Sequence, residues 1–208
     1  MTCIVGVTHK GRVYMGGDSA GVSGLDLTVR KDQKVFPNGE FAIGFTSSFR
    51  MGQILQYVFI PPEIVAGESL SAFIVSRFIP AVRDTFKREG FTYVESSREH
   101  GGCFLVGVRG RLFQIDSDFQ VGESIDAFAA IGCGPAYAYG SLHSTTGAPG
   151  KRIMSALEAA AHFSAGVVGP FNMVETAKGG ECPPSSAPII QAPKTGSGSK
   201  SNGLHPIC

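Results

Sequence analysis

The sequence predicts an α+β protein with antiparallel sheets, and three features carry that prediction. Short apolar segments come in pairs joined by glycine-containing turns, as at residues 4–15 and 102–115, which is the pattern of β-hairpins. Residues 48–58 and 70–86 place apolar side chains three or four positions apart, as amphipathic helices do. Runs of strands alternate with runs of helices along the chain, which indicates antiparallel sheets with helices packed outside them.

The first half of the chain begins with a predicted hairpin. Its strands contain IVGV (residues 4–7) and VYM (13–15), on either side of the turn HKG (9–11). A second pair of strands is expected at 34–36 and 41–45, because the turn sequence Pro-Asn-Gly separates two apolar segments there. The second of these strands, FAIGF, has no polar residue and is therefore expected to be largely buried.

Two helices follow in the sequence. The first is expected over residues 48–58, and two consecutive prolines at 61–62 separate it from the second. The second helix is expected over residues 70–86, where Leu70, Phe73 and further apolar residues form one stripe. Pro80 interrupts that stripe and is expected to bend the helix.

The second half repeats this order. A hairpin over residues 102–115 precedes a short strand at 128–131. Pro135 is suited to the first turn of a helix, and another helix is expected around residues 153–161. A last strand is expected at 171–175.

The C-terminal segment differs in composition from the rest. From residue 178 onward the chain is rich in Gly, Pro and Ser and poor in apolar residues. Such a segment cannot bury enough apolar surface to order itself. We therefore expect one folded domain over residues 1–177 and a flexible tail over residues 178–208.

Composition excludes several classes of protein. With 208 residues, 43% of them hydrophobic, the chain can form one sizeable core. A formal net charge of +1 gives no electrostatic reason to expect binding to nucleic acid or to an anionic membrane. No apolar segment is as long as a membrane span, and the N-terminus lacks the features of a signal peptide, so a cytoplasmic location is expected. The five cysteines lack metal-binding spacing and are expected to be mostly reduced thiols: Cys3, Cys103, Cys133, Cys182 and Cys208.

The residue after the initiator methionine has catalytic potential. Removal of Met1, which the small Thr2 permits, leaves a threonine with a free α-amine. That amine has an ordinary pKa of about 7.7–8.0, so it can act as a base near neutral pH. One residue then supplies both nucleophile and base. Many proteins begin with Met-Thr for no catalytic reason, so Thr2 alone does not establish this chemistry. Cys3 is an alternative nucleophile if two residues are removed.

Two further residues complete a recognisable pattern. Asp18 lies 16 positions after Thr2 in the segment GGDS, and Lys34 lies 32 positions after it. At these intervals the three residues resemble the proteasome β-subunit and HslV-like family of N-terminal nucleophile hydrolases. The segments KVFPNGEFAIGFTSS, AIGCGPAYAYGSL, ALEAAAHF and FNMVE are similar to later parts of that family, so the resemblance covers roughly residues 2–175.

The resemblance implies a fold, an activity and an assembly. The family's fold is a four-layer α-β-β-α sandwich with two antiparallel sheets. The family hydrolyses peptide bonds of peptides or unfolded proteins, without a metal or organic cofactor. Its members form stacked six- or seven-membered rings, which implies a homo-oligomeric ring here and an ATPase unfoldase as a partner.

Elementary chemistry supports the same three residues. A lysine close to the threonine hydroxyl lowers the pKa of that hydroxyl and favours attack. A buried lysine loses its proton unless a carboxylate keeps it charged, which gives Asp18 a role beside Lys34. Taken singly, a surface lysine and an aspartate in a turn are the simpler interpretations.

The resemblance also implies roles for residues around the nucleophile. Ser47 stands where the family has a glycine whose backbone N–H stabilises the oxyanion, although a helix-capping serine is the alternative. Cys133 replaces the family's serine near the α-amine, and thiols are poorer hydrogen-bonding groups. The family's late aspartate is missing, and Ser164 is the candidate to replace it. The substrate pocket is expected near three residues: Gly21, Phe36 and Thr46.

Two other functions remain open at this point. The chain could be a catalytically inactive homologue that serves as a structural or binding subunit, which retention of Met1 would favour. It could also be an amidase of the wider N-terminal nucleophile class that acts on a small molecule, which an open cleft in a monomer or dimer would favour.

Overall fold

A computed structural model of the protein describes residues 1–95 and 98–176, and it shows a mixed α/β fold with antiparallel sheets. This confirms the predicted α+β class. The predicted tail, residues 178–208, lies outside the described residues, as do Cys182 and Cys208.

The N-terminal strand lies inside a four-stranded antiparallel sheet. Across this sheet the strands are β12 (Phe128–Gly132), β1 (Cys3–His9), β2 (Arg12–Gly17) and β13 (Asn172–Glu175). The predicted first hairpin is thus confirmed, with Ile4 opposite Gly17. Because β1 has a neighbour on each side, the start of the chain is held by two ladders of hydrogen bonds.

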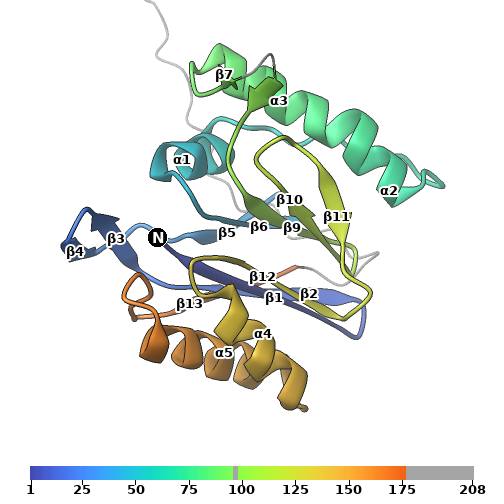
Figure 1. The fold of residues 1–208 in the computed structure, drawn as a ribbon. Coiled ribbons are helices and arrows are strands. Elements are labelled where there is room, and N and C mark those ends of the chain that lie inside the picture. Colours follow the sequence, from blue (N-terminus) through green and yellow to red (C-terminus); the bar gives the residue numbers. More distant parts are fainter. Residues whose placement is uncertain (96–97, 177–208) are drawn as a thin grey trace, which may run out of the picture.

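A second antiparallel sheet has five strands. In order they are β11 (Val121–Glu123), β10 (Arg111–Ile115), β9 (Phe104–Val108), β6 (Phe41–Phe45) and β5 (Val35–Asn38). The two sheets lie face to face (Figure 1). Buried apolar side chains fill the space between them: Ile4, Val13, Met15, Val35, Ala42, Leu105, Leu112, Ala129 and Ile131.

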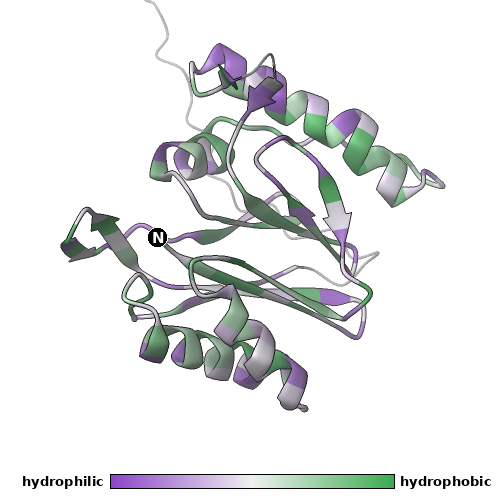
Figure 2. Ribbon diagram, in the orientation of Figure 1, coloured by the Kyte–Doolittle hydropathy of each residue, from purple (hydrophilic) through white to green (hydrophobic). Residues whose placement is uncertain are grey.

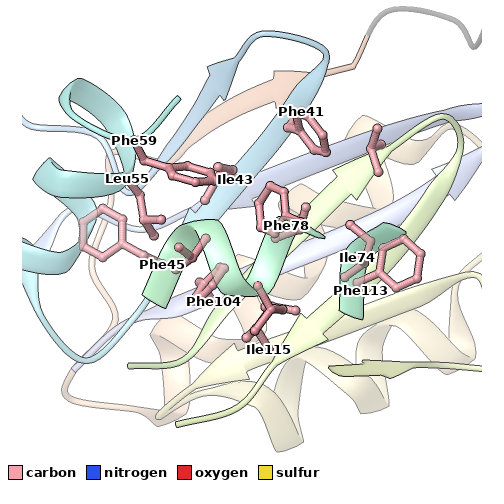
Figure 3. Packing of buried hydrophobic residues seen from close by; sticks show 14 of the residues in the cluster. Phe41, Ile43, Phe45, Leu55, Phe59, Ile74, Phe78, Phe104, Phe113 and Ile115 are labelled. Carbon is pink, nitrogen blue, oxygen red and sulfur yellow. The ribbon is translucent and has the colours of Figure 1, made fainter. Parts of the chain in front are cut away.

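Helices from the first half of the chain cover the five-stranded sheet (Figure 1). They are α1 (Phe49–Tyr57), α2 (Leu70–Phe73) and α3 (Ile79–Arg88), with a π-helical turn at Ile74–Phe78 between the last two. The π-helical turn immediately precedes Pro80, which has no N–H to continue the α-helical ladder. Phenylalanine rings dominate the core beneath these helices, as Figure 3 shows around Phe78. The ring of Phe78 lies 5.1 Å from that of Phe41 and 5.2 Å from that of Phe59.

Helices from the second half cover the other face of the four-stranded sheet (Figure 1). They are α4 (Pro135–Ser144) and α5 (Pro149–Phe163), and both begin with the proline at the first helical position. Cys3, Val5 and Val7 of β1 point toward them, whereas Ile4 points toward the other sheet. Alternation along a strand therefore places Thr2 on the side of Ile4, at the entrance to the space between the sheets.

Some strands were absent from the prediction. They form two small hairpins, β3 (Ala20–Ser23) with β4 (Asp26–Val29) and β7 (Tyr93–Glu95) with β8 (Arg98–His100), and the edge strand β11. Every residue of β4 is exposed. A strand without a buried face has no alternation of apolar and polar residues to reveal it. Figure 2 shows the contrast between the largely apolar central strands and the outer helices, which carry many hydrophilic residues.

Candidate active site

Thr2 is held in place by the backbone on both sides. Its carbonyl oxygen accepts a hydrogen bond of 2.7 Å from the N–H of Cys133, at the end of β12. The next N–H, that of Cys3, donates to Oδ1 of Asp18 at 2.9 Å. Gly132 adopts φ +111°, and a Cβ atom there would lie 2.0 Å from the Thr2 carbonyl oxygen. Only glycine allows β12 to approach the start of β1 this closely.

Asp18 and Lys34 form a salt bridge in which both side chains are 0% exposed. The Lys34 ammonium donates to both carboxylate oxygens at 3.0 Å. The carboxylate also accepts hydrogen bonds of 2.9 Å from the N–H groups of Cys3 and Ala20. Every oxygen of Asp18 therefore has two donors, which is the condition under which a buried ion pair is tolerated.

The lysine and the threonine hydroxyl meet at one atom, the carbonyl oxygen of Met1. Lys34 Nζ lies 3.4 Å from that oxygen, and the Thr2 hydroxyl donates to it. Burial lowers the pKa of Lys34, and Asp18 opposes that shift by its charge and its hydrogen bond. The structure thus brings the three residues identified from the sequence together, with Asp18 as the group that keeps the lysine charged.

The other side of Thr2 is more open. The Thr2 N–H donates to Sγ of Cys133 at 3.3 Å, and the exposed Cys133 thiol receives a second contact of 3.5 Å from the Ser164 hydroxyl. Ser164 follows the last residue of α5. Cys133 thus contacts the Thr2 nitrogen directly, and Ser164 contacts Cys133 rather than that nitrogen.

Ser47 has an unusual backbone conformation. Its φ of +74° lies in the left-handed region, and the N–H of Ser48 donates to the carbonyl of Thr46 at 2.9 Å. Together these features describe a γ-turn, a rare and strained conformation. Within residues 1–95 and 98–176, the Ser47 N–H donates to no protein acceptor. Ser47 lines an open cleft.

The alternative role for Ser47, as a helix cap, belongs to its neighbour. The hydroxyl of Ser48 accepts a hydrogen bond of 3.4 Å from the N–H of Met51 and caps α1. Ser47 instead accepts a hydrogen bond of 3.4 Å from the N–H of Cys103. The sequence motif Ser-Ser thus divides two roles between adjacent residues.

The cleft has a volume of about 410 Å³ and lies between the ends of the two sheets. Met1 lies in it, together with residues from the γ-turn and from the ends of β10 and β12. Its polar side chains and thiols come from six residues: Thr46, Ser47, Cys103, Gln114, Asp116 and Cys133.

The predicted pocket residues have different locations. Thr46 lines this cleft, whereas Phe36 is 1% exposed and packs in the phenylalanine core with its ring 6.3 Å from that of Phe45. Phe36 therefore does not line the cleft. Gly21 lies on β3, where a Cβ atom would meet Cδ of Arg30 at 2.6 Å. It is not part of the cleft wall.

Three cleft residues were not identified from the sequence: Cys103, Gln114 and Asp116. One available signal was the segment LFQID (residues 112–116), where polar residues interrupt an apolar strand near its end. Burial, with the negative charge of Asp116 as the second cause, raises the pKa of the Cys103 thiol. Cys103 is therefore held in its neutral form.

Cys3, the alternative nucleophile, is fully buried. Burial and then the charge of Asp18 raise the pKa of its thiol to about 12. Since the thiolate is the nucleophilic form, Cys3 is poorly suited to attack.

Two absences apply to the described residues alone. Within residues 1–95 and 98–176, no group of three or more His, Cys, Asp or Glu side chains is placed to hold a metal ion. In the same part of the chain, no helix has the length and apolar character to cross a membrane.

The sequence matches no family model and no curated protein. Solved structures do resemble the chain. The structure of Thiobacillus denitrificans BPH is 20% identical, with a TM-score of 0.70, over 86% of this chain and 100% of that one. BPH in complex with epoxomicin is 19% identical, with a TM-score of 0.69, over 85% and 99%. Eukaryotic HslV from Trypanosoma brucei is 18% identical, with a TM-score of 0.59, over 84% and 98%. The chain therefore has a proteasome-like fold, which confirms for the fold the resemblance seen in its sequence.

Proposed function

We propose that this chain is a threonine-type peptidase, a hydrolase of the N-terminal nucleophile class, that uses Thr2 after removal of Met1. The observation that carries the proposal is the buried Asp18–Lys34 pair, whose ammonium shares the Met1 carbonyl oxygen with the Thr2 hydroxyl. Burial of a lysine is costly, and a buried cation that shares a hydrogen-bond acceptor with a threonine hydroxyl is typical of a functional site.

The reaction begins with the free α-amine of Thr2. The amine takes the proton from the hydroxyl while Oγ1 forms a bond to the carbonyl carbon of the substrate. The carbonyl oxygen becomes an oxyanion, and we assign its stabilisation to the backbone N–H of Ser47. The tetrahedral intermediate then expels the amine of the leaving peptide, which receives the proton. The resulting ester on Thr2 is hydrolysed by water, with the α-amine again acting as the base.

Supporting residues act on the two ends of Thr2. Lys34, kept charged by Asp18, lowers the pKa of the hydroxyl. Cys133 and Ser164 orient the α-amine through the contacts of 3.3 Å and 3.5 Å. With Met1 attached, the nitrogen of Thr2 belongs to a peptide bond and cannot act as a base. Activity therefore requires removal of Met1.

The family resemblance also supports a domain organisation, a substrate class and an assembly for this enzyme. We assign residues 1–177 to one catalytic domain with the four-layer α-β-β-α arrangement, and residues 178–208 to a flexible tail. The substrates are peptides or unfolded proteins, and the enzyme is a cytoplasmic, homo-oligomeric ring that an ATPase unfoldase can supply. A sedimentation mass of one or two chains at micromolar concentration would contradict the ring.

One observation favours a second function. The α-amine side of the site rests on an exposed thiol and a hydroxyl, with no carboxylate in the hydrogen-bonded chain. A catalytically inactive structural or binding subunit does not need a firmly oriented α-amine, so the weak support seen here is compatible with that function. An amidase acting on small molecules would use the same Thr2 chemistry and would differ in its substrate.

A covalent label separates these functions. A peptide bearing an electrophilic group should add about one equivalent to the purified protein, and the adduct should map to Thr2. Epoxomicin, the compound in the BPH complex, is a second probe. Intact mass should show a chain without Met1, and Thr2→Ala should abolish labelling because alanine keeps the amine and removes the attacking oxygen. Retained Met1 with no adduct would establish the inactive subunit, and peptide labelling without peptide turnover would favour the amidase.

A further inference from the structure

The cleft beside Thr2 carries a negative charge that the proposed mechanism does not use. Among the side chains that line it in the described part of the chain, Asp116 alone is charged. Asp116 follows the last residue of β10 and is half-buried. Ser47 and Cys133, the candidate oxyanion donor and the contact of the Thr2 nitrogen, line the same cleft.

The carboxylate of Asp116 is fixed by neutral partners. Gln114 Nε2 donates to Oδ1 at 2.9 Å, and Gln120 Nε2 donates to Oδ2 at 3.4 Å. Its backbone N–H also donates to the carbonyl of Gln120 at 3.0 Å. In residues 1–95 and 98–176, no Lys, Arg or His forms a salt bridge with it. The position of the carboxylate is therefore set, while its charge has no cationic partner.

Two basic side chains that lie over the ring of Phe49, Lys34 and Arg30, are already paired with carboxylates. Lys34 is paired with Asp18, and the guanidinium of Arg30 is paired with Asp32 through Nε and Nη2. When the α-amine of Thr2 is neutral, as the proposed mechanism requires, Asp116 gives the cleft a net negative charge. The carboxylate is half-buried, and a charge pair formed there is stronger than one on a fully exposed surface.

We infer that Asp116 makes this cleft selective for a basic side chain, lysine or arginine, in a substrate residue next to the scissile bond. The inference rests on the proposed function and specifies its substrate class. A volume of about 410 Å³ accommodates a peptide segment with a long side chain. The ammonium or guanidinium group reaches the carboxylate and replaces water there with a charge-assisted hydrogen bond. An acidic side chain in the same position is repelled.

The negative charge of Asp116 also affects another residue of the cleft, Cys103. After burial, the negative charge of Asp116 is the largest cause that raises the pKa of the Cys103 thiol. Cys103 lines the same cleft, so the charge acts on groups inside it rather than only on solvent.

The test compares two blocked fluorogenic peptides that differ at one residue flanking the scissile bond. One carries lysine there, and the other carries norleucine, which has the same aliphatic length without the charge. The wild-type protein without Met1 should show a kcat/KM about tenfold higher for the lysine peptide, which corresponds to about 1.4 kcal/mol. Asp116→Asn keeps the shape and an oxygen that can accept from Gln114 Nε2 while it removes the charge, so the ratio should fall to about one. Asp116→Lys should bring the ratio below one, and this variant should favour a third peptide that carries glutamate at the same position.

Asp118→Asn is the matched control. Asp118 is exposed, lies two residues away and is not part of the cleft wall, so this variant should keep the wild-type ratio. A wild-type ratio near one, or an unchanged ratio in Asp116→Asn, would overturn the inference while leaving the peptidase in place.

A binding measurement covers the case in which no peptide is hydrolysed, which would refute the proposed function. Acetyl-lysine N-methylamide should shift the backbone NMR signals of Gln114 and Asp116 in the wild-type protein, and acetyl-norleucine N-methylamide should not. Loss of the lysine-induced shift in Asp116→Asn would support the acidic subsite by itself. Equal shifts from both compounds, or none, would overturn it.

Discussion

The two sides of Thr2 are built in opposite ways. On the hydroxyl side, Asp18 and Lys34 are completely buried and hydrogen-bonded to each other and to the backbone. On the nitrogen side, the partner is the exposed Cys133 thiol, supported by the Ser164 hydroxyl at 3.5 Å. Electrostatic activation of the nucleophile is thus fixed by the core, whereas orientation of the base depends on weak contacts at the surface. Changes on the first side should therefore affect folding and activity together, and changes on the second should affect activity alone.

The largest effect is expected from Lys34→Met, which removes the cation and leaves Asp18 buried without its partner. Breaking a buried ion pair in this way costs about 3–5 kcal/mol. We expect a loss of that size in the free energy of unfolding, measured by urea titration, and a loss of Thr2 labelling. The matched control is Lys31→Met, because Lys31 is exposed and should tolerate the change. The double variant Asp18→Asn/Lys34→Met should regain part of the stability and none of the labelling. Normal labelling of Lys34→Met would remove the lysine from the mechanism.

The pH profile of hydrolysis should have two limbs, an acid limb set by the α-amine and an alkaline limb set by Lys34. Activity should rise as the α-amine loses its proton, around its ordinary pKa of about 7.7–8.0. It should fall again when Lys34 loses its proton, and this fall should begin below the ordinary lysine value of 10.5, because burial lowers the pKa of Lys34. Beyond that limb the rate should drop about tenfold per pH unit.

Asp18 raises the pKa of Lys34, so Asp18→Asn should move the alkaline limb to lower pH in the activity that remains. Asp26→Asn, at an exposed position of the β3–β4 hairpin, should leave both limbs in place. An alkaline limb that stays fixed in Asp18→Asn would show that another group controls it.

A smaller effect is expected at Cys133. Serine is a stronger hydrogen-bond donor and acceptor than cysteine, so Cys133→Ser should raise kcat several-fold by holding the α-amine more firmly. Cys133→Ala should lower kcat about tenfold, since no side-chain atom then contacts the nitrogen. Neither variant should change the melting temperature by more than a few degrees, because the thiol is exposed. Equal rates in all three proteins would show that the thiol does not orient the base.

The smallest effect on stability is expected from Ser47→Gly, at a residue that lines the same cleft as Cys133. Ser47→Gly keeps the N–H and relieves the positive φ, and the gain is partly offset by the backbone freedom of glycine. We expect the free energy of unfolding to rise by about 0.5–1 kcal/mol with labelling retained. Ser47→Pro removes the N–H and also excludes the positive φ, so it should lower stability and abolish labelling. A Ser47→Pro variant that folds and reacts normally would exclude this N–H as the oxyanion donor.

Sequence patterns predicted the parts of the molecule that have a buried face. The hairpin β1–β2, the strands β5, β6, β9 and β10 and the longer helices all alternate or repeat apolar residues, because each packs one face against a core. The β3–β4 hairpin packs no such face and was missed. Its residues Leu25, Leu27 and Val29 are exposed, so their apolar character gave no periodic signal.

The candidate site was predictable where spacing along the chain is informative. The β1–β2 hairpin brings Thr2 beside Asp18, and Lys34 comes directly before β5, so their intervals along the chain reflect the geometry. Asp116 could not be found in this way, because it reaches the cleft through the pairing of β10 with β9 and of β9 with β6. Phe36 was expected near the pocket from the family resemblance, but its side chain is buried in the phenylalanine core and does not line the cleft.

The position of Met1 has a consequence for any chain extended ahead of Thr2. Met1 packs against Gly166, where a Cβ atom would lie 2.4 Å from the Cβ of Met1, and it lies inside the cleft. An N-terminal extension must pass through the same space that a substrate needs. Tethered by a single peptide bond, it competes at an effective concentration in the millimolar range, whatever the amount of free substrate. Such a chain is its own competitive inhibitor until the extension is cut away.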